Sequence, residues 1–137
     1  MSQSLHSDKL PQGEEPQIRV MAMPADTNAS GDIFGGWLMS QVDIAGSIAA
    51  YRRARGRIVT IAVNEFRFIN PVYVGDLISL YARVIHVGNT SIRVMIEGFA
   101  ERSRGTDECD RVAEAEITYV AIDEQGKPRP VDDRAEY

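Results

Sequence analysis

The chain has 137 residues, of which 44% are apolar and 26% are charged, so it is long enough to form one globular domain with its own core. Its 15 basic and 20 acidic side chains leave a net charge of -5. This balance argues against a general nucleic-acid-binding protein, because such proteins present a basic face to phosphates.

The sequence indicates a soluble, cytoplasmic protein. A single cysteine, Cys109, excludes a disulfide within the chain and fits a reducing compartment. Residues 1–16 contain no apolar run, so they do not resemble a signal peptide. The most apolar stretch, residues 33–50, is interrupted by glycines and by Asp43, which makes it a poor membrane span.

Polar segments mark both ends of the chain. Residues 1–17 are rich in Ser, Gln, Pro and Glu, and we expect a disordered tail there. Residues 124–137 contain one glycine and two prolines and are expected to form a polar C-terminal tail. The folded domain is therefore placed at residues 18–123.

A short β-prone run at residues 18–23 is followed by a glycine-rich loop at residues 26–36. The spacing of Leu38, Val42 and Ala45 predicts a helix over residues 37–55. Gly56 is the expected residue beyond its last turn, because glycine adopts the left-handed conformation that ends many helices.

Four strands are predicted after the helix, at residues 58–69, 77–86, 92–97 and 113–121, from their β-branched, aromatic and alternating patterns. A charged loop is expected over residues 101–111. One strand, one long helix and four further strands predict an α+β architecture in which a single sheet packs on the helix.

A small, polar stripe on the helix contains the first candidate catalytic residue. Helical spacing places Gly36, Ser40, Asp43 and Ser47 on one side. A charge inside an apolar helix is unfavourable unless a partner compensates it. Asp43 is therefore either a hydrogen-bonded structural acid or a carboxylate that the helix carries for chemistry.

The loop before the helix offers two further candidates. Gly35 and Gly36 either give a flexible start to the helix or leave backbone N–H groups free to bind an anion or an oxyanion. Asn28 is either a turn residue or a functional amide. No metal site is expected, because His6 and His86 lie far apart and Cys109 is alone.

Two stretches resemble hotdog-fold acyl-CoA thioesterases, and among them the bacterial YciA-type hydrolases. The first runs from Asp26 to Trp37 and continues through Ser40 to Asp43. The second comprises residues 56–63, 68–71 and 74–76. Together they extend the likeness over residues 18–131. The sequence departs from relatives whose helix begins with His-Gly-Gly, because Phe34 precedes Gly35 and Gly36 here.

The resemblance implies a five-stranded antiparallel sheet wrapped around one central helix, and a homodimer with a continuous sheet that often forms a trimer of dimers. It matches Asp43 to the catalytic carboxylate and Asn28 to an asparagine that faces it from the partner subunit. Gly36 matches the residue whose N–H polarises the thioester carbonyl.

The resemblance also implies where coenzyme A binds. The pantetheine arm is expected near residues 61–63 and 90–92, and Arg57 is a candidate phosphate contact. The residues in these two segments are Ile61, Ala62, Val63, Thr90, Ser91 and Ile92. Coenzyme A is part of the substrate and product, and no separate cofactor is expected.

The sequence therefore predicts hydrolysis of an acyl-CoA thioester, with Asp43 as general base or nucleophile. One rival is a hotdog hydratase or dehydratase, which usually pairs an acid with a histidine that this loop and helix lack. A second rival is a non-catalytic acyl-CoA sensor, which would normally carry an added DNA-binding segment.

Overall fold

The computed structural model describes residues 8–102 and 108–133. Within them lie one long helix, a short 3₁₀ turn and a five-stranded sheet. In chain order the elements are β1 (Ile18–Met21), η2 (Pro24–Asp26), α1 (Gly35–Ala54), β2 (Ile58–Phe68), β3 (Leu77–Val87), β4 (Ser91–Glu101) and β5 (Cys109–Ala121).

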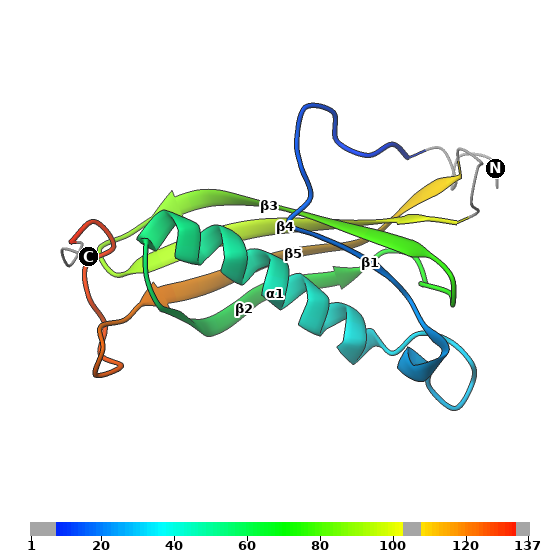
Figure 1. Cartoon of the computed structure of the whole chain (residues 1–137), viewed down its shortest axis with the longest axis horizontal. Coiled ribbons are helices and arrows are strands. Elements are labelled where there is room, and N and C mark those ends of the chain that lie inside the picture. Colours follow the sequence, from blue (N-terminus) through cyan, green and yellow to red (C-terminus); the bar gives the residue numbers. More distant parts are fainter. Residues whose placement is uncertain (1–7, 103–107, 134–137) are drawn as a thin grey trace.

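The strands form one antiparallel sheet in the order β1-β3-β4-β5-β2. Figure 1 shows α1 lying lengthwise across one face of this sheet. The core lies between them, where Leu38 and Val42 of the helix meet buried side chains of the sheet such as Ile96 and Ile117. The predicted α+β fold, a five-stranded sheet around one helix, is confirmed.

Strand β2 is an edge strand whose pairing with β5 is interrupted twice. Thr60 pairs with Tyr119 and Ala62 with Thr118, so Ile61 is an extra residue in the ladder, and a second shift follows Val63. Such bulges bend a strand and redirect its side chains. Four large apolar residues of β2 remain exposed: Val59, Ile61, Val63 and Phe68.

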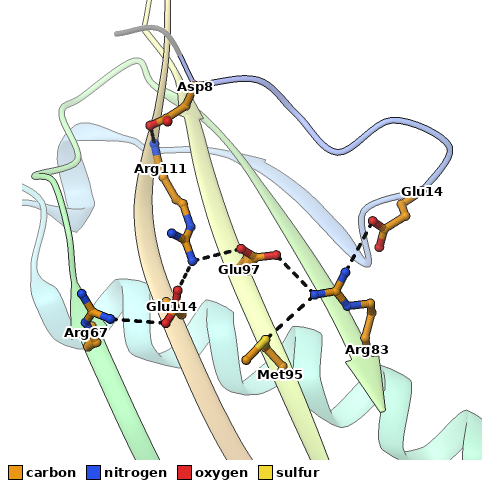
Figure 2. Close-up of polar contacts among 8 residues, drawn as sticks. All are labelled: Asp8, Glu14, Arg67, Arg83, Met95, Glu97, Arg111 and Glu114. Carbon is orange, nitrogen blue, oxygen red and sulfur yellow. Dashed lines mark hydrogen bonds and ion pairs between the residues drawn. The ribbon is translucent and has the colours of Figure 1, made fainter. Parts of the chain in front are cut away.

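The sheet face away from α1 carries a network of charged side chains (Figure 2). Glu97 and Glu114 are cross-strand partners, an arrangement that is unfavourable for like charges. Arg111 lies between them and pairs with both. Arg67 adds a contact to Glu114 and Arg83 adds one to Glu97. The network therefore offsets the repulsion on the outer face.

The N-terminal segment covers part of this outer face. We expected a disordered tail over residues 1–17, of which residues 1–7 lie outside the described residues. In the rest, Leu10 packs against Tyr81, Phe99 and Cys109, and Asp8 accepts a hydrogen bond of 2.7 Å from the backbone N–H of Arg111.

The C-terminal segment, expected as a polar tail, also makes defined contacts as far as residue 133. The Val131 side chain is fully buried and its N–H donates to the carbonyl of Asn89 over 2.8 Å. Arg129 is buried as well, and its Nη2 donates to the carbonyl of Ala54 over 2.8 Å. This contact ties the segment to the end of α1.

The end of α1 differs from the prediction by one residue. The left-handed position is Arg55, with φ of 54°, rather than Gly56. The N–H of Arg55 and that of Gly56 both return to the carbonyl of Tyr51. Arg55 thus takes the strained conformation that glycine would adopt without cost, because backbone and Arg129 contacts fix the helix end there.

Candidate active site

Asp43 lies midway along α1, on the side that faces β2 and β5. Its Oδ1 accepts a hydrogen bond from Thr60 Oγ1 at 3.0 Å. The Tyr119 hydroxyl lies 3.1 Å from the same oxygen and 3.0 Å from the Asp43 backbone oxygen. Asp43 Oδ2 accepts no hydrogen bond from the residues that the structure describes. The carboxylate therefore has one anchored oxygen and one that is free to react.

The Tyr119 hydroxyl acts as a donor in this arrangement. Its side chain is fully buried in the core between the helix and the sheet. Burial raises the pKa of Tyr119 above its ordinary value, and the negative charge and hydrogen-bond acceptance of Asp43 raise it further. The phenol therefore keeps its proton at neutral pH.

The first turn of α1 presents uncapped backbone N–H groups. Phe34 occupies the N-cap position but forms no side-chain cap, and the first turn contains no acidic residue. A Cβ added at Gly36 would meet nothing within 4 Å, so open space surrounds this residue. Gly36 precedes Asp43 by seven residues, or about 10 Å along the helix axis.

Asn28 holds the loop before α1 in its turn conformation. Its Oδ1 accepts hydrogen bonds from the N–H groups of Ser30 at 2.9 Å and Asp32 at 3.1 Å. Its Nδ2 donates to none of the described residues, and no hydrogen bond within the described chain joins it to Asp43. The turn interpretation of Asn28 therefore holds in the single chain, while its amide nitrogen stays available.

Two cavities lie at opposite ends of α1. The first has a volume of about 290 Å³, borders the first turn and is lined by groups that include Gly35, Phe68 and Val72. The second, of about 460 Å³, is lined by groups that include Tyr51 and Arg57. Asp43 lies on the helix between them.

The structure separates the candidate coenzyme A residues into three locations. Ile61 and Val63 are exposed on the edge strand β2, with Ala62 half-buried between them. Arg57, Thr90 and Ser91 gather at one end of β5, where the N–H of residue 121 donates to Thr90 and that of residue 122 to Arg57. Ile92 is fully buried in the core, so its side chain faces no open surface.

The sequence interpretation assigned no site role to Thr60 or Tyr119. Both carry hydroxyl groups, and their register on β2 and β5 places them side by side. The alternation of β5 does put Tyr119 on the helix-facing side. The bulge at Ile61 could not be read from the sequence, because residue alternation alone does not reveal an extra residue in a ladder.

Two features are absent from the described residues. No group of three or more His, Cys, Asp or Glu among residues 8–102 and 108–133 could hold a metal ion. No helix in these ranges is long and apolar enough to cross a membrane.

Comparisons with known proteins show the family to which the chain belongs. The family model described as the thioesterase superfamily matches residues 30–106. The acyl-CoA thioester hydrolase YciA of Salmonella typhimurium is 50% identical over 126 residues, which cover 90% of this chain and 94% of that protein.

Solved structures extend the likeness to three dimensions. A hexameric hotdog-fold thioesterase of Campylobacter jejuni has a TM-score of 0.84 and 45% identity, covering 90% of this chain and 94% of that one. The acyl-CoA hydrolase of Staphylococcus aureus, solved with butyryl coenzyme A and coenzyme A, has a TM-score of 0.77 and 29% identity over 82% of this chain and 68% of that one.

The Staphylococcus aureus enzyme has also been solved as variants in which an aspartate, an asparagine or a threonine is replaced by alanine. The sequence identity, the shared fold and the coverage of both chains all lead to one assignment. The chain belongs to the thioesterase superfamily, within its group of hotdog-fold, YciA-type proteins.

Proposed function

We propose that the protein hydrolyses acyl-CoA thioesters to a free carboxylic acid and coenzyme A. The observation that carries this proposal is the half-anchored carboxylate of Asp43. Thr60 and Tyr119 hold Oδ1, whereas Oδ2 accepts no hydrogen bond from the described residues, and the half-buried Asp43 lies beside the exposed Thr60 of β2. The relatives that share most of the chain are named as hydrolases of this kind.

Asp43 acts on water or on the thioester itself. As a general base, Oδ2 takes a proton while the water oxygen attacks the thioester carbonyl carbon. As a nucleophile, Oδ2 attacks that carbon and forms a mixed anhydride, which water then hydrolyses. In both routes the carbon–sulfur bond breaks and the coenzyme A sulfur leaves with the electron pair and gains a proton.

The first turn of α1 stabilises the oxygen of the reacting carbonyl. The Gly36 N–H has no partner within the helix, and the positive end of the helix dipole adds to its attraction for negative charge. Preorganised donors of this kind stabilise the developing oxyanion more than the starting carbonyl. The absence of a Cβ at Gly36 lets a substrate approach the backbone closely.

The site is completed by a second copy of the chain. Gly36 and Asp43 of one helix lie about 10 Å apart, too far for both to contact one thioester carbonyl directly, and within the described residues the free Nδ2 of Asn28 makes no hydrogen bond to Asp43. The exposed apolar edge of β2 suits pairing with the same strand of a partner, which would extend the sheet. A homodimer, assembled further into a hexamer, places Asn28 of one subunit opposite Asp43 of the other.

Coenzyme A lies along the surface between the exposed part of β2 and the end of β5. The exposed Arg57 guanidinium can pair with a phosphate, because its hydrogen bonds to the described residues are two long ones to backbone carbonyls, at 3.3 Å and 3.5 Å. Ile61 and Val63 offer apolar contacts to pantetheine. The chemistry uses water and residues of the protein, with coenzyme A as part of substrate and product.

Release of free thiol from acyl-CoAs tests the proposed reaction. We expect turnover on at least one member of a panel from acetyl-CoA to palmitoyl-CoA, followed with a thiol-reactive dye. A hydratase would instead consume an enoyl-CoA without releasing thiol, and a sensor would bind acyl-CoA without turnover. Either result would contradict hydrolysis and support the corresponding rival function.

A further inference from the structure

The carboxylate of Asp43 is supported from beneath the helix by one buried phenol. Tyr119 extends from β5 toward the underside of α1, where its hydroxyl reaches both the backbone oxygen and Oδ1 of Asp43. The two oxygens share the single proton of the phenol. The contact with the backbone oxygen restrains the position of the residue, and the contact with Oδ1 restrains the rotation of the carboxylate.

Gly46 makes this approach possible. It lies on the buried side of α1, one turn beyond Asp43. A Cβ at this position would lie 2.2 Å from the Tyr119 hydroxyl and 3.0 Å from Cδ1 of Ile96, closer than side chains can pack. A helix interior disfavours glycine relative to alanine by roughly 1 kcal/mol, so space for the phenol is the evident gain at this position.

The register of the sheet brings two donors to one oxygen. Thr60 and Tyr119 are directly paired residues of β2 and β5, and their hydroxyls lie 3.0 Å and 3.1 Å from Oδ1. Thr60 sits on the edge strand, whereas Tyr119 comes from the interior of the sheet, where packing on both sides restrains it. Tyr119 is therefore the more rigid of the two supports.

We propose that Tyr119 is a positioning residue for the hydrolysis reaction: its hydroxyl anchors Oδ1 of Asp43 and thereby aims Oδ2 at the water or the thioester. The inference rests on the proposed function, since it acts through Asp43. It also divides the carboxylate into a supporting oxygen and a reacting oxygen. Tyr119 itself touches neither substrate nor water.

The test replaces Tyr119 by Phe, which keeps the buried ring and removes the hydroxyl. We expect kcat on the best acyl-CoA of the panel to fall by roughly 10- to 100-fold, the scale of one hydrogen bond to a charged group. KM should change little, because the hydroxyl does not contact the substrate. Circular dichroism and thermal unfolding establish that the variant folds.

Tyr81→Phe is the matched control. Tyr81 is also buried, but it lies on the outer face of the sheet, packed against Phe99 at a ring-centroid distance of 5.9 Å. The same chemical change there should leave kcat and KM at wild-type values. If Tyr119→Phe retained as much activity as Tyr81→Phe, the inference would be overturned.

A double-mutant cycle separates positioning from general support of the fold. In an Asp43→Ala background, Tyr119→Phe should lower the residual kcat no further, because the group on which the hydroxyl acts is absent. Equal losses in both backgrounds would show that the hydroxyl acts independently of Asp43. Gly46→Ala provides a second test, because the added methyl group displaces the Tyr119 hydroxyl without changing Tyr119 itself. It should lower kcat in the same way, and it keeps the inference testable if Tyr119→Phe folds poorly.

The cycle also distinguishes two kinds of failure. An inactive Asp43→Ala beside a fully active Tyr119→Phe would overturn the role of Tyr119 and leave the proposed function in place. A fully active Asp43→Ala would overturn the role of Asp43, and the positioning role of Tyr119 with it.

Discussion

The carboxylate of Asp43 combines two requirements that usually conflict. A charge on an apolar helix needs hydrogen bonds to compensate its desolvation, whereas a catalytic group needs an unoccupied atom. Thr60 and Tyr119 meet the first requirement at Oδ1, and Oδ2, which accepts no hydrogen bond from the described residues, meets the second. The structural and catalytic interpretations of Asp43 are therefore compatible at the level of single atoms.

Replacing Asp43 separates its two roles. Asp43→Asn keeps the size of the side chain and can still accept a hydrogen bond at one oxygen, but it neither takes up a proton nor attacks a thioester. We expect kcat to fall at least ~100-fold, the usual scale for loss of a positioned acid or base. Thermal unfolding should remain cooperative. Near-normal turnover by a folded Asp43→Asn protein would contradict its catalytic role.

Cys109 is predicted to be unreactive in the folded protein. Burial, and then the negative charge of Glu101, raise the pKa of the Cys109 thiol to about 11 from an ordinary value of 9.0. A thiol dye should therefore label it slowly at about pH 8 and rapidly after unfolding in urea, because the thiolate is the reactive form. Rapid labelling of the native protein would contradict this burial.

The same shift gives a pH dependence of stability. Above about pH 9 the unfolded chain loses the Cys109 proton while the folded protein keeps it until about pH 11. Since stability falls with pH wherever the folded state binds more protons, the free energy of unfolding should decline across this window. In denaturant titrations the free energy of unfolding of Cys109→Ala should decline less over this pH range. A decline equal to that of the wild type would mean that other groups cause the effect.

At the level of elements, the two ends of α1 show what sequence patterns can and cannot predict. The apolar spacing of Leu38, Val42 and Ala45 predicted the helix, because periodicity reflects one buried face. Its end was placed at Gly56 on local preference, whereas the left-handed residue is Arg55. The adjacent carbonyl of Ala54 accepts a hydrogen bond from Arg129, which lies 75 residues further along the chain, and local preference carries no information about such distant contacts.

The start of α1 can be tested with two substitutions at Gly36. Gly36→Pro removes the N–H outright, and proline is tolerated in a first helical turn. We expect kcat to fall by roughly 10²–10³-fold, as for loss of a single oxyanion donor. Gly36→Ala keeps the N–H and finds open space, so its loss should be much smaller. Equal kcat values for the two folded variants would mean that this N–H does not stabilise the transition state.

The end of α1 is predicted to depend on Arg129. Its guanidinium donates to the carbonyls of residues 54, 130, 131 and 133, of which residues 54 and 131 are buried, so Arg129→Met removes the donor from two buried acceptors. A loss of about 2–3 kcal/mol in the free energy of unfolding is expected. Arg53→Met is the control, since its ion pair with Asp132 is largely exposed and should contribute under ~1 kcal/mol. Equal losses in urea titrations would contradict this assignment.

At the level of the whole molecule, the edge strand β2 supports the proposed dimer. Its outer edge has no strand beside it, and Ile61 is 59% exposed and Val63 45% exposed. An apolar edge of this kind promotes pairing with another chain. The same edge lies beside Asp43, through Thr60, so association and catalysis involve one region of the molecule. The sequence alone indicated this only through resemblance, because exposure depends on the folded sheet.

Mixing two inactive variants tests whether each site draws on two subunits. Light scattering should first show a dimer or a larger even assembly, and an active monomer would contradict the shared site. Asn28→Ala and Asp43→Ala subunits are then unfolded together and refolded in equal amounts. In a heterodimer one site carries both substitutions and the other carries neither. Random pairing makes about half of the dimers mixed, so roughly a quarter of wild-type activity should return.

Activity that stays at the level of the separate variants, in mixtures verified to contain heterodimers, would place Asn28 and Asp43 in the site of a single subunit. The free Nδ2 of Asn28 would then need a target within its own chain, which a conformational change of the loop before α1 would have to supply.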